Sequence, residues 1–330
     1  MKRSLSLSVV LLVLAACGTN GGSRPATTTL GGTTIGDAAE TTTTVPFDTT
    51  TVATSTEFPV TVQDDNGSVT IDAMPRAVVS LSTVATEMLF AVGASPQVVA
   101  VDDQSNYPAD VPMTDLSGFT PNVEAILAYE PDLVFISHDP GDLVAALAAA
   151  GVPVINYTAA MTFDDVYHQI EAIGTATGHH EEAVTVIETI SSDLEKIVDE
   201  APGTPEGTTY FYELDNTLYT ATSTTFFGQI FALFGLENIA DAADADGAAP
   251  GYPQLSSEFV VAADPDLIFL ADTLYGESAE TVAARPGWDV LSAVQAGHVF
   301  ALDSDVASRW GPRLVDFAQS VSDALVDYTS

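Results

Sequence analysis

The chain has 330 residues, of which 46 are Asp or Glu and only eight are Lys or Arg, so its formal net charge at pH 7 is −38. A surface of this charge repels polyanions, which excludes nucleic acid as a partner. The chain contains one cysteine, so no disulfide can form within it and the fold must be stabilised by a hydrophobic core.

The first 16 residues have the pattern of an export signal that ends at a lipidated cysteine. Lys2 and Arg3 precede an apolar stretch, residues 5–16, that is shorter than the roughly 20 residues needed to span a bilayer. Small residues then lead directly to Cys17. We predict that residues 1–16 are a lipoprotein signal peptide and that lipid on Cys17 anchors the exported protein to the outer face of the cell membrane. A secretory signal followed by an incidental cysteine is the alternative.

The segment that follows, residues 17–57, is rich in threonine, glycine and alanine, with repeated runs of threonine. Such a composition offers too little apolar surface to offset the entropy lost when a backbone becomes ordered. We therefore predict a disordered tether between the lipid and the folded body.

Residues 58–330 alternate between strand and helix patterns, which is typical of an α/β protein. A hairpin is predicted where residues 58–62 and 68–71 flank Asp65-Asn66-Gly67. Short, continuously apolar runs predict buried parallel strands, and amphipathic runs predict helices. We expect strands at 77–81, 97–101, 133–137, 152–156, 208–213, 267–270 and 299–302, and helices at 83–92, 123–129, 143–150, 226–234, 256–262, 290–296 and 312–327.

Between the two α/β regions, residues 162–200 are almost entirely helical in pattern, with a break at Thr177-Gly178. A helix of about 20 residues spans about 30 Å, the width of a small lobe. One such helix would couple two lobes stiffly. The predicted organisation is a signal peptide (1–16), a tether (17–57), an N-terminal lobe (58–160), a helical segment with an inter-lobe helix (161–203) and a C-terminal lobe (204–330).

Eight short motifs are distributed in order along the folded region. They are MPRAVVSL at 74–81, TEMLFAVG at 86–93, PNVEAIL at 121–127 and EPDLV at 130–134 in the first lobe, and YPQLS at 252–256, DPDLI at 264–268, RPGW at 285–288 and SRWGPR at 308–313 in the second. Together these motifs resemble the periplasmic-binding-protein family that serves ABC importers of iron complexes and vitamin B12.

The resemblance implies two lobes with mainly parallel sheets, a ligand cleft between them and a single long connecting helix that limits closure to a few degrees. It also implies a substrate-binding lipoprotein that delivers a small-molecule metal complex to a permease dimer with its ATPase subunits. Glu124 and Glu258 match the positions at which the family docks on its permease. Each also opens a predicted helix, where an acid is favoured by about 0.3–1 kcal/mol whatever its function.

The candidate ligand contacts follow predicted strands, because ligands of open α/β sheets bind beyond the carboxyl ends of the strands. Aromatic rings supply flat contact area, and an acid or an arginine can orient polar groups of a ligand. In the N-terminal lobe the candidates are Ser82, Thr83, Asn106, Tyr107, Phe119 and His138, and in the C-terminal lobe they are Tyr212, Asp215, Tyr252, Asp305 and Arg309.

The scarcity of basic residues constrains the ligand. A tri-anionic ferric catecholate would need several converging cations, and the lobes offer only Arg76, Arg285, Arg309 and Arg313. The sequence therefore favours a ferric siderophore of low charge, such as a hydroxamate, with cobalamin second. Haem is third, because it would need an axial ligand such as His138 or a cleft tyrosine.

An exported enzyme and a pure adhesin are the competing classes. The sequence has no nucleophile elbow, no dinucleotide fingerprint after a strand and no P-loop. We therefore expect a protein that is not an enzyme, with no cofactor and no directly bound metal ion. Turnover of a ligand would favour an enzyme, and a lack of saturable small-molecule binding would favour an adhesin.

Overall fold

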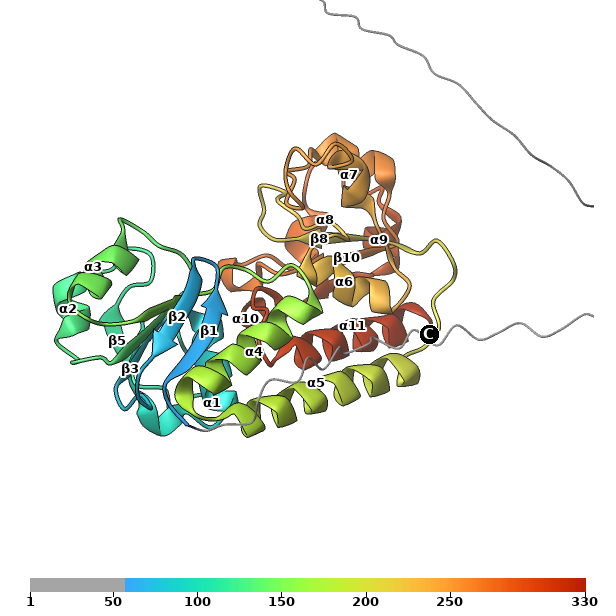
Figure 1. The fold of residues 1–330 in the computed structure, drawn as a ribbon. Coiled ribbons are helices and arrows are strands. Elements are labelled where there is room, and N and C mark those ends of the chain that lie inside the picture. The colour runs from blue at the N-terminus through green and yellow to red at the C-terminus, as the bar shows by residue number, and fades with distance from the viewer. Residues whose placement is uncertain (1–56) are drawn as a thin grey trace, which may run out of the picture. The chain divides into compact units, whose positions relative to one another are not determined.

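The computed structural model describes residues 57–330. The predicted signal peptide, Cys17 and the tether up to residue 56 lie outside the described residues. Within the described part of the chain, two α/β lobes are connected through helices (Figure 1). This arrangement confirms the predicted fold class.

The described chain begins with an antiparallel hairpin of β1 (Val60–Asp64) and β2 (Gly67–Ile71), in which Val60 lies opposite Ile71. Gly67 has a φ of +127°, a backbone conformation that glycine adopts without strain. The hairpin predicted from Asp65-Asn66-Gly67 is therefore confirmed.

The N-terminal sheet has five parallel strands in the order β5-β4-β3-β6-β7. All side chains of its central strands, β3 and β6, are buried, which accounts for the apolar runs in the sequence. The strands are β3 (Val78–Leu81), β4 (Val98–Asp102), β5 (Met113–Leu116), β6 (Leu133–Ile136) and β7 (Val154–Asn156). The helices are α1 (Thr83–Ala91), α2 (Val123–Leu127), α3 (Leu143–Ala149) and the 3-10 turn η1 (Ser95–Gln97).

The C-terminal sheet has four parallel strands in the order β11-β10-β8-β9. These are β8 (Thr209–Glu213), β9 (Glu237–Asn238), β10 (Leu267–Leu270) and β11 (Val299–Ala301). The α-helices are α6 (Phe226–Leu233), α7 (Ser257–Ala263), α8 (Ala279–Ala283), α9 (Ser292–Ala296), α10 (Ser304–Ala307) and α11 (Leu314–Tyr328), and the 3-10 turns are η2 (Ile239–Ala243) and η3 (Thr273–Tyr275).

Two long helices follow the last strand of the N-terminal sheet and precede the first strand of the C-terminal sheet. They are α4 (Phe163–Thr177) and α5 (His180–Glu200). Thr162 begins α4 with a capping box, in which its side chain accepts from the backbone N–H of Asp165. The 21 residues of α5 correspond to a length of about 31 Å. The predicted long connecting helix is therefore present.

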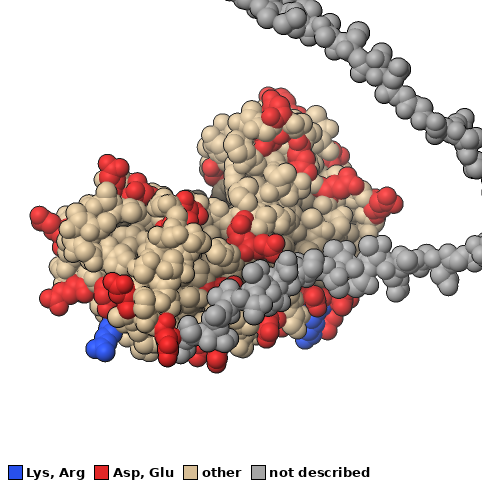
Figure 2. All heavy atoms as spheres, viewed as in Figure 1, with Lys and Arg blue, Asp and Glu red and all other residues tan. Residues whose placement is uncertain are grey.

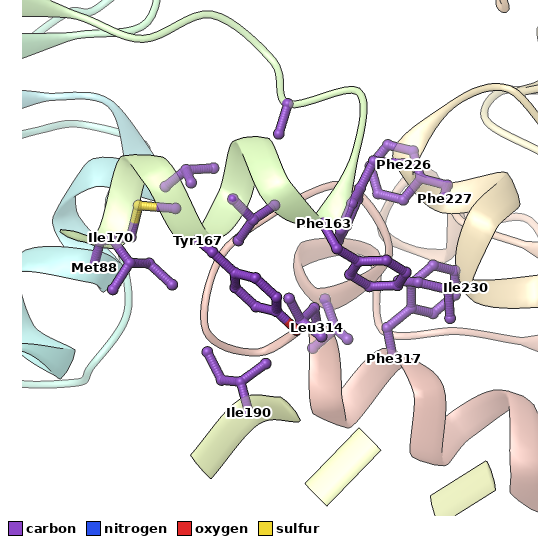
Figure 3. Close-up of a cluster of buried hydrophobic side chains, with 14 of the residues drawn as sticks. Met88, Phe163, Tyr167, Ile170, Ile190, Phe226, Phe227, Ile230, Leu314 and Phe317 are labelled. Atoms are coloured by element: carbon purple, nitrogen blue, oxygen red, sulfur yellow. The ribbon is translucent and has the colours of Figure 1, made fainter. Parts of the chain in front are cut away.

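One apolar cluster includes side chains from both lobes. Figure 3 shows Met88 of α1, Phe163 of α4 and Ile190 of α5 in the same cluster as side chains of α6 and α11. The rings of Phe163 and Phe226 lie with their centroids 5.5 Å apart. The lobes are therefore joined by packed side chains as well as by the chain itself.

Acidic side chains are spread over the face of the molecule shown in Figure 2, and basic ones are sparse there. No helix within residues 57–330 is long and apolar enough to cross a membrane.

Candidate ligand cleft

A cavity of about 340 Å³ is lined by residues of both lobes. On the N-terminal side its walls follow the carboxyl ends of β3, β4, β5 and β6, and on the C-terminal side those of β8, β10 and β11. In each sheet, strands are added first on one side of the strand that comes first in the chain and then on its other side. That strand is β3 in the N-terminal sheet and β8 in the C-terminal sheet. Open α/β sheets bind ligands at such switch points. We call this cavity the cleft.

The N-terminal side of the cleft contains a buried carboxylate. Asp102, at the end of β4, accepts hydrogen bonds from the backbone N–H groups of Ser105 at 2.9 Å and Gln104 at 3.3 Å. Burial raises the pKa of Asp102. A Cβ atom on Gly118 would lie 2.6 Å from the Leu81 carbonyl oxygen and 3.0 Å from Oδ2 of Asp102, so the chain passes here only because residue 118 is glycine.

Three large apolar side chains border the cleft and are strongly exposed. Phe119 of the N-terminal lobe is 71% exposed, and Leu274 and Tyr275 of the C-terminal lobe are 73% and 83% exposed. The Phe119 ring also lies 5.6 Å from the His138 ring, centroid to centroid. Exposed apolar surface that faces a concave site from two sides is typical of ligand contact.

Arg309 is the only arginine or lysine among the residues that line the cleft, and its side chain is 8% exposed. Its guanidinium donates to Glu87 Oε1 at 2.8 Å, to Asn106 Oδ1 at 2.9 Å and to Asp305 Oδ1 at 2.8 Å. Arg309 is therefore paired with two carboxylates, and because Glu87 also pairs with Arg313, two arginines are balanced by two carboxylates.

A second buried ion-pair cluster includes Glu213, the residue before Leu214 of the C-terminal wall. Arg285 donates to both carboxylate oxygens of Glu213 at 2.5 Å and to Glu277 at 2.6 Å. Burial raises the pKa of Glu213 to about 7, against the opposing effect of Arg285. Asp272, whose carboxylate oxygens have no hydrogen-bond partner in the structure, also has a pKa raised by burial. Asp272 and Glu277 flank the segment that carries Leu274 and Tyr275.

Six of the eleven predicted contacts line the cleft: Ser82, Thr83, Phe119, His138, Asp305 and Arg309. Asn106 does not line the cavity but contacts two residues that do, because it donates to Asp305 Oδ2 at 2.7 Å and accepts from Arg309. Tyr107 does not line the cavity; its ring lies 4.2 Å from the Arg313 guanidinium.

Three predicted contacts on the C-terminal side lie elsewhere. Tyr212 is inside strand β8 rather than after it, is fully buried and donates its hydroxyl to the Ala307 carbonyl, so the prediction for this residue is wrong. Tyr252 is partly buried against the apolar cluster, and Asp215 accepts from Thr217 in a turn. Neither of these two lines the cavity.

Several lining residues were not predicted from the sequence, and Leu274 and Tyr275 are the exposed apolar residues among them. Their signal was available, because these two apolar residues lie four and five positions after the end of the Leu267–Leu270 strand and directly precede Gly276. The other lining residues that were not predicted, five of which are Gly, Ala or Ser, are Leu81, Asp102, Gln104, Gly118, Ser137, Leu214, Ala271, Ser304 and Ser308.

Glu124 and Glu258 are exposed residues in the first turns of α2 and α7, in different lobes (Figure 1). Each of these short helices begins at a side-chain cap, Asn122 for α2 and Ser256 for α7. Within residues 57–330, no group of three or more His, Asp or Glu side chains is placed to hold a metal ion.

Comparison with known proteins identifies the family. Residues 78–306 match the model of the periplasmic binding protein family, and the chain belongs to this family. The resemblance seen in the sequence motifs is therefore confirmed.

Among curated relatives, the chain is 32% identical over 279 residues to an uncharacterised ABC transporter substrate-binding lipoprotein, YvrC, of Bacillus subtilis, with 81% of this chain and 86% of the relative covered. It is 31% identical over 268 residues to a cobalamin-binding protein of Halobacterium salinarum, with 78% and 72% covered.

Solved structures agree in fold. The vitamin B12 binding protein BtuF of Vibrio cholerae superimposes with a TM-score of 0.61 at 26% identity, over 78% of this chain and 99% of that one. The haem-binding protein RhuT of Roseiflexus superimposes with a TM-score of 0.66 at 23% identity, over 78% and 100%.

Proposed function

We propose that this chain is the substrate-binding protein of an ABC importer and that its ligand is cobalamin or a closely related corrinoid. The observation that carries the proposal is the neutralised Arg309. Its guanidinium is paired with Glu87 and Asp305, so the cleft offers no uncompensated arginine or lysine among its lining residues.

This charge balance discriminates between ligand classes. A ferric tris-catecholate, and a haem with two propionates, carry negative charge that would enter the cleft beside Asp102 and Asp305 without a free arginine to offset it. Cobalamin is rich in neutral carboxamide groups, which donate hydrogen bonds that carboxylates and hydroxyls accept. The cleft supplies such acceptors at Asp102, Asp305, Ser82 and Ser137.

The apolar border of the cleft fits the same ligand class. Phe119, Leu274 and Tyr275 present exposed apolar surface from both lobes, which suits the broad faces of a macrocycle. Relatives named as cobalamin-binding or vitamin B12-binding proteins, at 27–31% identity, also support cobalamin over the ferric siderophore that the sequence alone favours.

A ferric hydroxamate of low charge is the second candidate, because it too would need no free cation. A thermal-shift panel on the full chain separates the candidates, with cyanocobalamin, a ferric hydroxamate, a ferric catecholate and haem as probes. A ligand present at 100 times its Kd adds about 2.7 kcal/mol to the free energy of unfolding. We expect cyanocobalamin to raise the melting temperature. A shift produced only by the hydroxamate or by haem would reassign the ligand, and no shift with any probe would argue against the whole proposal.

The proposal includes the partners and the location expected from the sequence. Lipid on Cys17 would hold the protein at the outer face of the membrane, and Glu124 and Glu258 would dock the two lobes on the two halves of a permease dimer that is driven by ATPase subunits. The exposure of both glutamates and their placement in separate lobes support this assignment.

A further inference from the structure

One buried carboxylate of the N-terminal lobe pairs with two arginines of the C-terminal lobe. Glu87, on α1, is 3% exposed. Its Oε1 accepts from Arg309 at 2.8 Å and from Arg313 Nη2 at 2.7 Å, and its Oε2 accepts from Arg313 Nε at 3.1 Å. The Arg313 contact is therefore bidentate, a geometry that fixes direction as well as distance.

The same two arginines make further contacts across the lobes. Arg309 donates to Asn106 of the N-terminal lobe and to Asp305 of its own lobe, and Asn106 in turn donates to Asp305 at 2.7 Å. Arg313 lies over the ring of Tyr107, also in the N-terminal lobe. We refer to Glu87, Arg309, Arg313, Asn106 and Asp305 as the inter-lobe ion-pair cluster.

We propose that Glu87 is a positioning residue for ligand binding, which fixes the resting angle between the lobes and holds the Arg309 guanidinium against Asp305. The cleft would then have its final width and charge pattern before the ligand arrives. The role in ligand binding rests on the proposed function, whereas the role in fixing the lobes does not.

Two kinds of contact join the lobes, and they differ in what they specify. The apolar cluster of α1, α4, α5, α6 and α11 buries surface, and burial of apolar surface is non-directional. Buried ion pairs contribute little net stability compared with apolar packing, but they cost a great deal when one partner is removed. A pair of this kind therefore disfavours any lobe angle that separates Glu87 from its arginines.

The first experiment measures the distance between the lobes directly. Spin labels are attached to cysteines introduced at Ala145, exposed on α3, and Ala296, exposed on α9, in a full chain whose Cys17 is replaced by serine. We expect a single narrow distance distribution in this background. Adding Glu87→Gln should broaden it, whereas the matched control Glu188→Gln, which removes an exposed charge on α5, should not.

Arg313 provides a second variant that does not line the cleft and leaves the contact between Glu87 and Arg309 in place. We expect Arg313→Gln to broaden the distribution less than Glu87→Gln, and Arg313→Lys, which keeps the charge, to restore part of the narrow distribution. If Glu87→Gln does not fold, the two Arg313 variants decide the question. Distributions as narrow as the background in every folded variant would overturn the proposal.

The second experiment measures binding of cyanocobalamin. When only a fraction of the molecules has the competent lobe angle, the apparent Kd rises by the inverse of that fraction. We expect Glu87→Gln to weaken binding by about tenfold or more, with Glu188→Gln unchanged. An unaltered affinity in Glu87→Gln would overturn the role in ligand binding. If cyanocobalamin does not bind even the unaltered chain, the proposed function fails, and the distance distributions still test the role of Glu87.

Discussion

Phe119 and Tyr275 come from different lobes and border the same cleft, and each leaves most of its ring exposed. Neither ring contributes much to the packing of its own lobe. The side chains that would contact a ligand are therefore not those that stabilise the empty protein, so the two properties can be changed independently.

The first prediction concerns these two rings. Phe119→Ala and Tyr275→Ala should each weaken ligand binding by about 1–2 kcal/mol, roughly five- to thirtyfold in Kd, because each removes apolar surface that a ligand would bury. The melting temperature of the empty protein should stay within a few degrees. Calorimetric titration and apo melting curves measure the two quantities separately.

Tyr212→Ala provides the contrast, because this ring is fully buried. Its loss should cost about 3–5 kcal/mol of unfolding free energy. Tyr129→Ala serves as the surface control, since Tyr129 is partly exposed and does not line the cleft. The assignment of the cleft walls is wrong if Phe119→Ala and Tyr275→Ala bind ligand as tightly as the Tyr129 variant does.

The second prediction concerns docking. The double change Glu124→Gln with Glu258→Gln should preserve ligand affinity, because neither residue lines the cleft. It should sharply reduce uptake and the ligand-stimulated ATP hydrolysis of the reconstituted transporter, since losing a desolvated charge pair costs about 2–5 kcal/mol. The control is Glu181→Gln with Glu188→Gln, which removes the same charge from exposed positions on α5. Equal transport by both double variants would leave the two acids as simple helix-start residues.

The third prediction concerns pH. The pKa of Glu213 is raised from 4.5 to about 7, mainly by burial, so the folded state binds this proton more tightly than the unfolded state does. The stabilisation from this group is fully present below about pH 4.5 and is lost as the pH rises through about 7. Between pH 5 and pH 8 the unfolding free energy of the unaltered chain should therefore fall more steeply than that of Glu213→Gln, by about 1–3 kcal/mol in total. Denaturant titrations at several pH values measure the slopes. Parallel slopes would show that Glu213 does not titrate in this range.

The fourth prediction concerns the membrane anchor. Cys17→Ala should release the protein from the membrane without changing ligand affinity, because Cys17 precedes the first described residue by 40 positions. Partition into a detergent phase measures the association. A variant that still partitions with the detergent would show that residue 17 is not the lipid attachment site.

The elements of the fold were predictable where both faces of a strand are buried or where apolar and polar residues alternate regularly along it. Every side chain in β3 and β6 is buried, and all of them are apolar except Ser80, whose hydroxyl donates to the Ser82 carbonyl. β5 was missed, since its sequence, Met113–Leu116, is that of a partly exposed edge strand with polar residues at its centre. The short helices α8 and α10 were also missed, although α2 and α9, which have five residues each, were predicted.

The candidate site was predictable in position but less so in its residues. Placing candidate contacts after strands selected Ser82, Phe119 and Asp305, which line the cavity, and their contact with a ligand stays a prediction. The same reasoning failed for Tyr212, because this residue lies before the end of both the predicted strand, 208–213, and the observed strand β8, where its side chain is buried. The pairing of Glu87 with Arg309 joins residues 222 positions apart, and no local pattern in the sequence indicates it.

The chain passes between the two sheets only once, since residues 78–156 supply every strand of one sheet and residues 209–301 every strand of the other. A single genetic crossover within the codons of α5 would therefore replace one complete wall of the cleft and leave the other intact. The hybrid would have to preserve the apolar surface that the lobes share and the match between Glu87 and its two arginines. Proteins built in this way can acquire a new ligand by exchanging half of a binding site in one step, without rebuilding the other half.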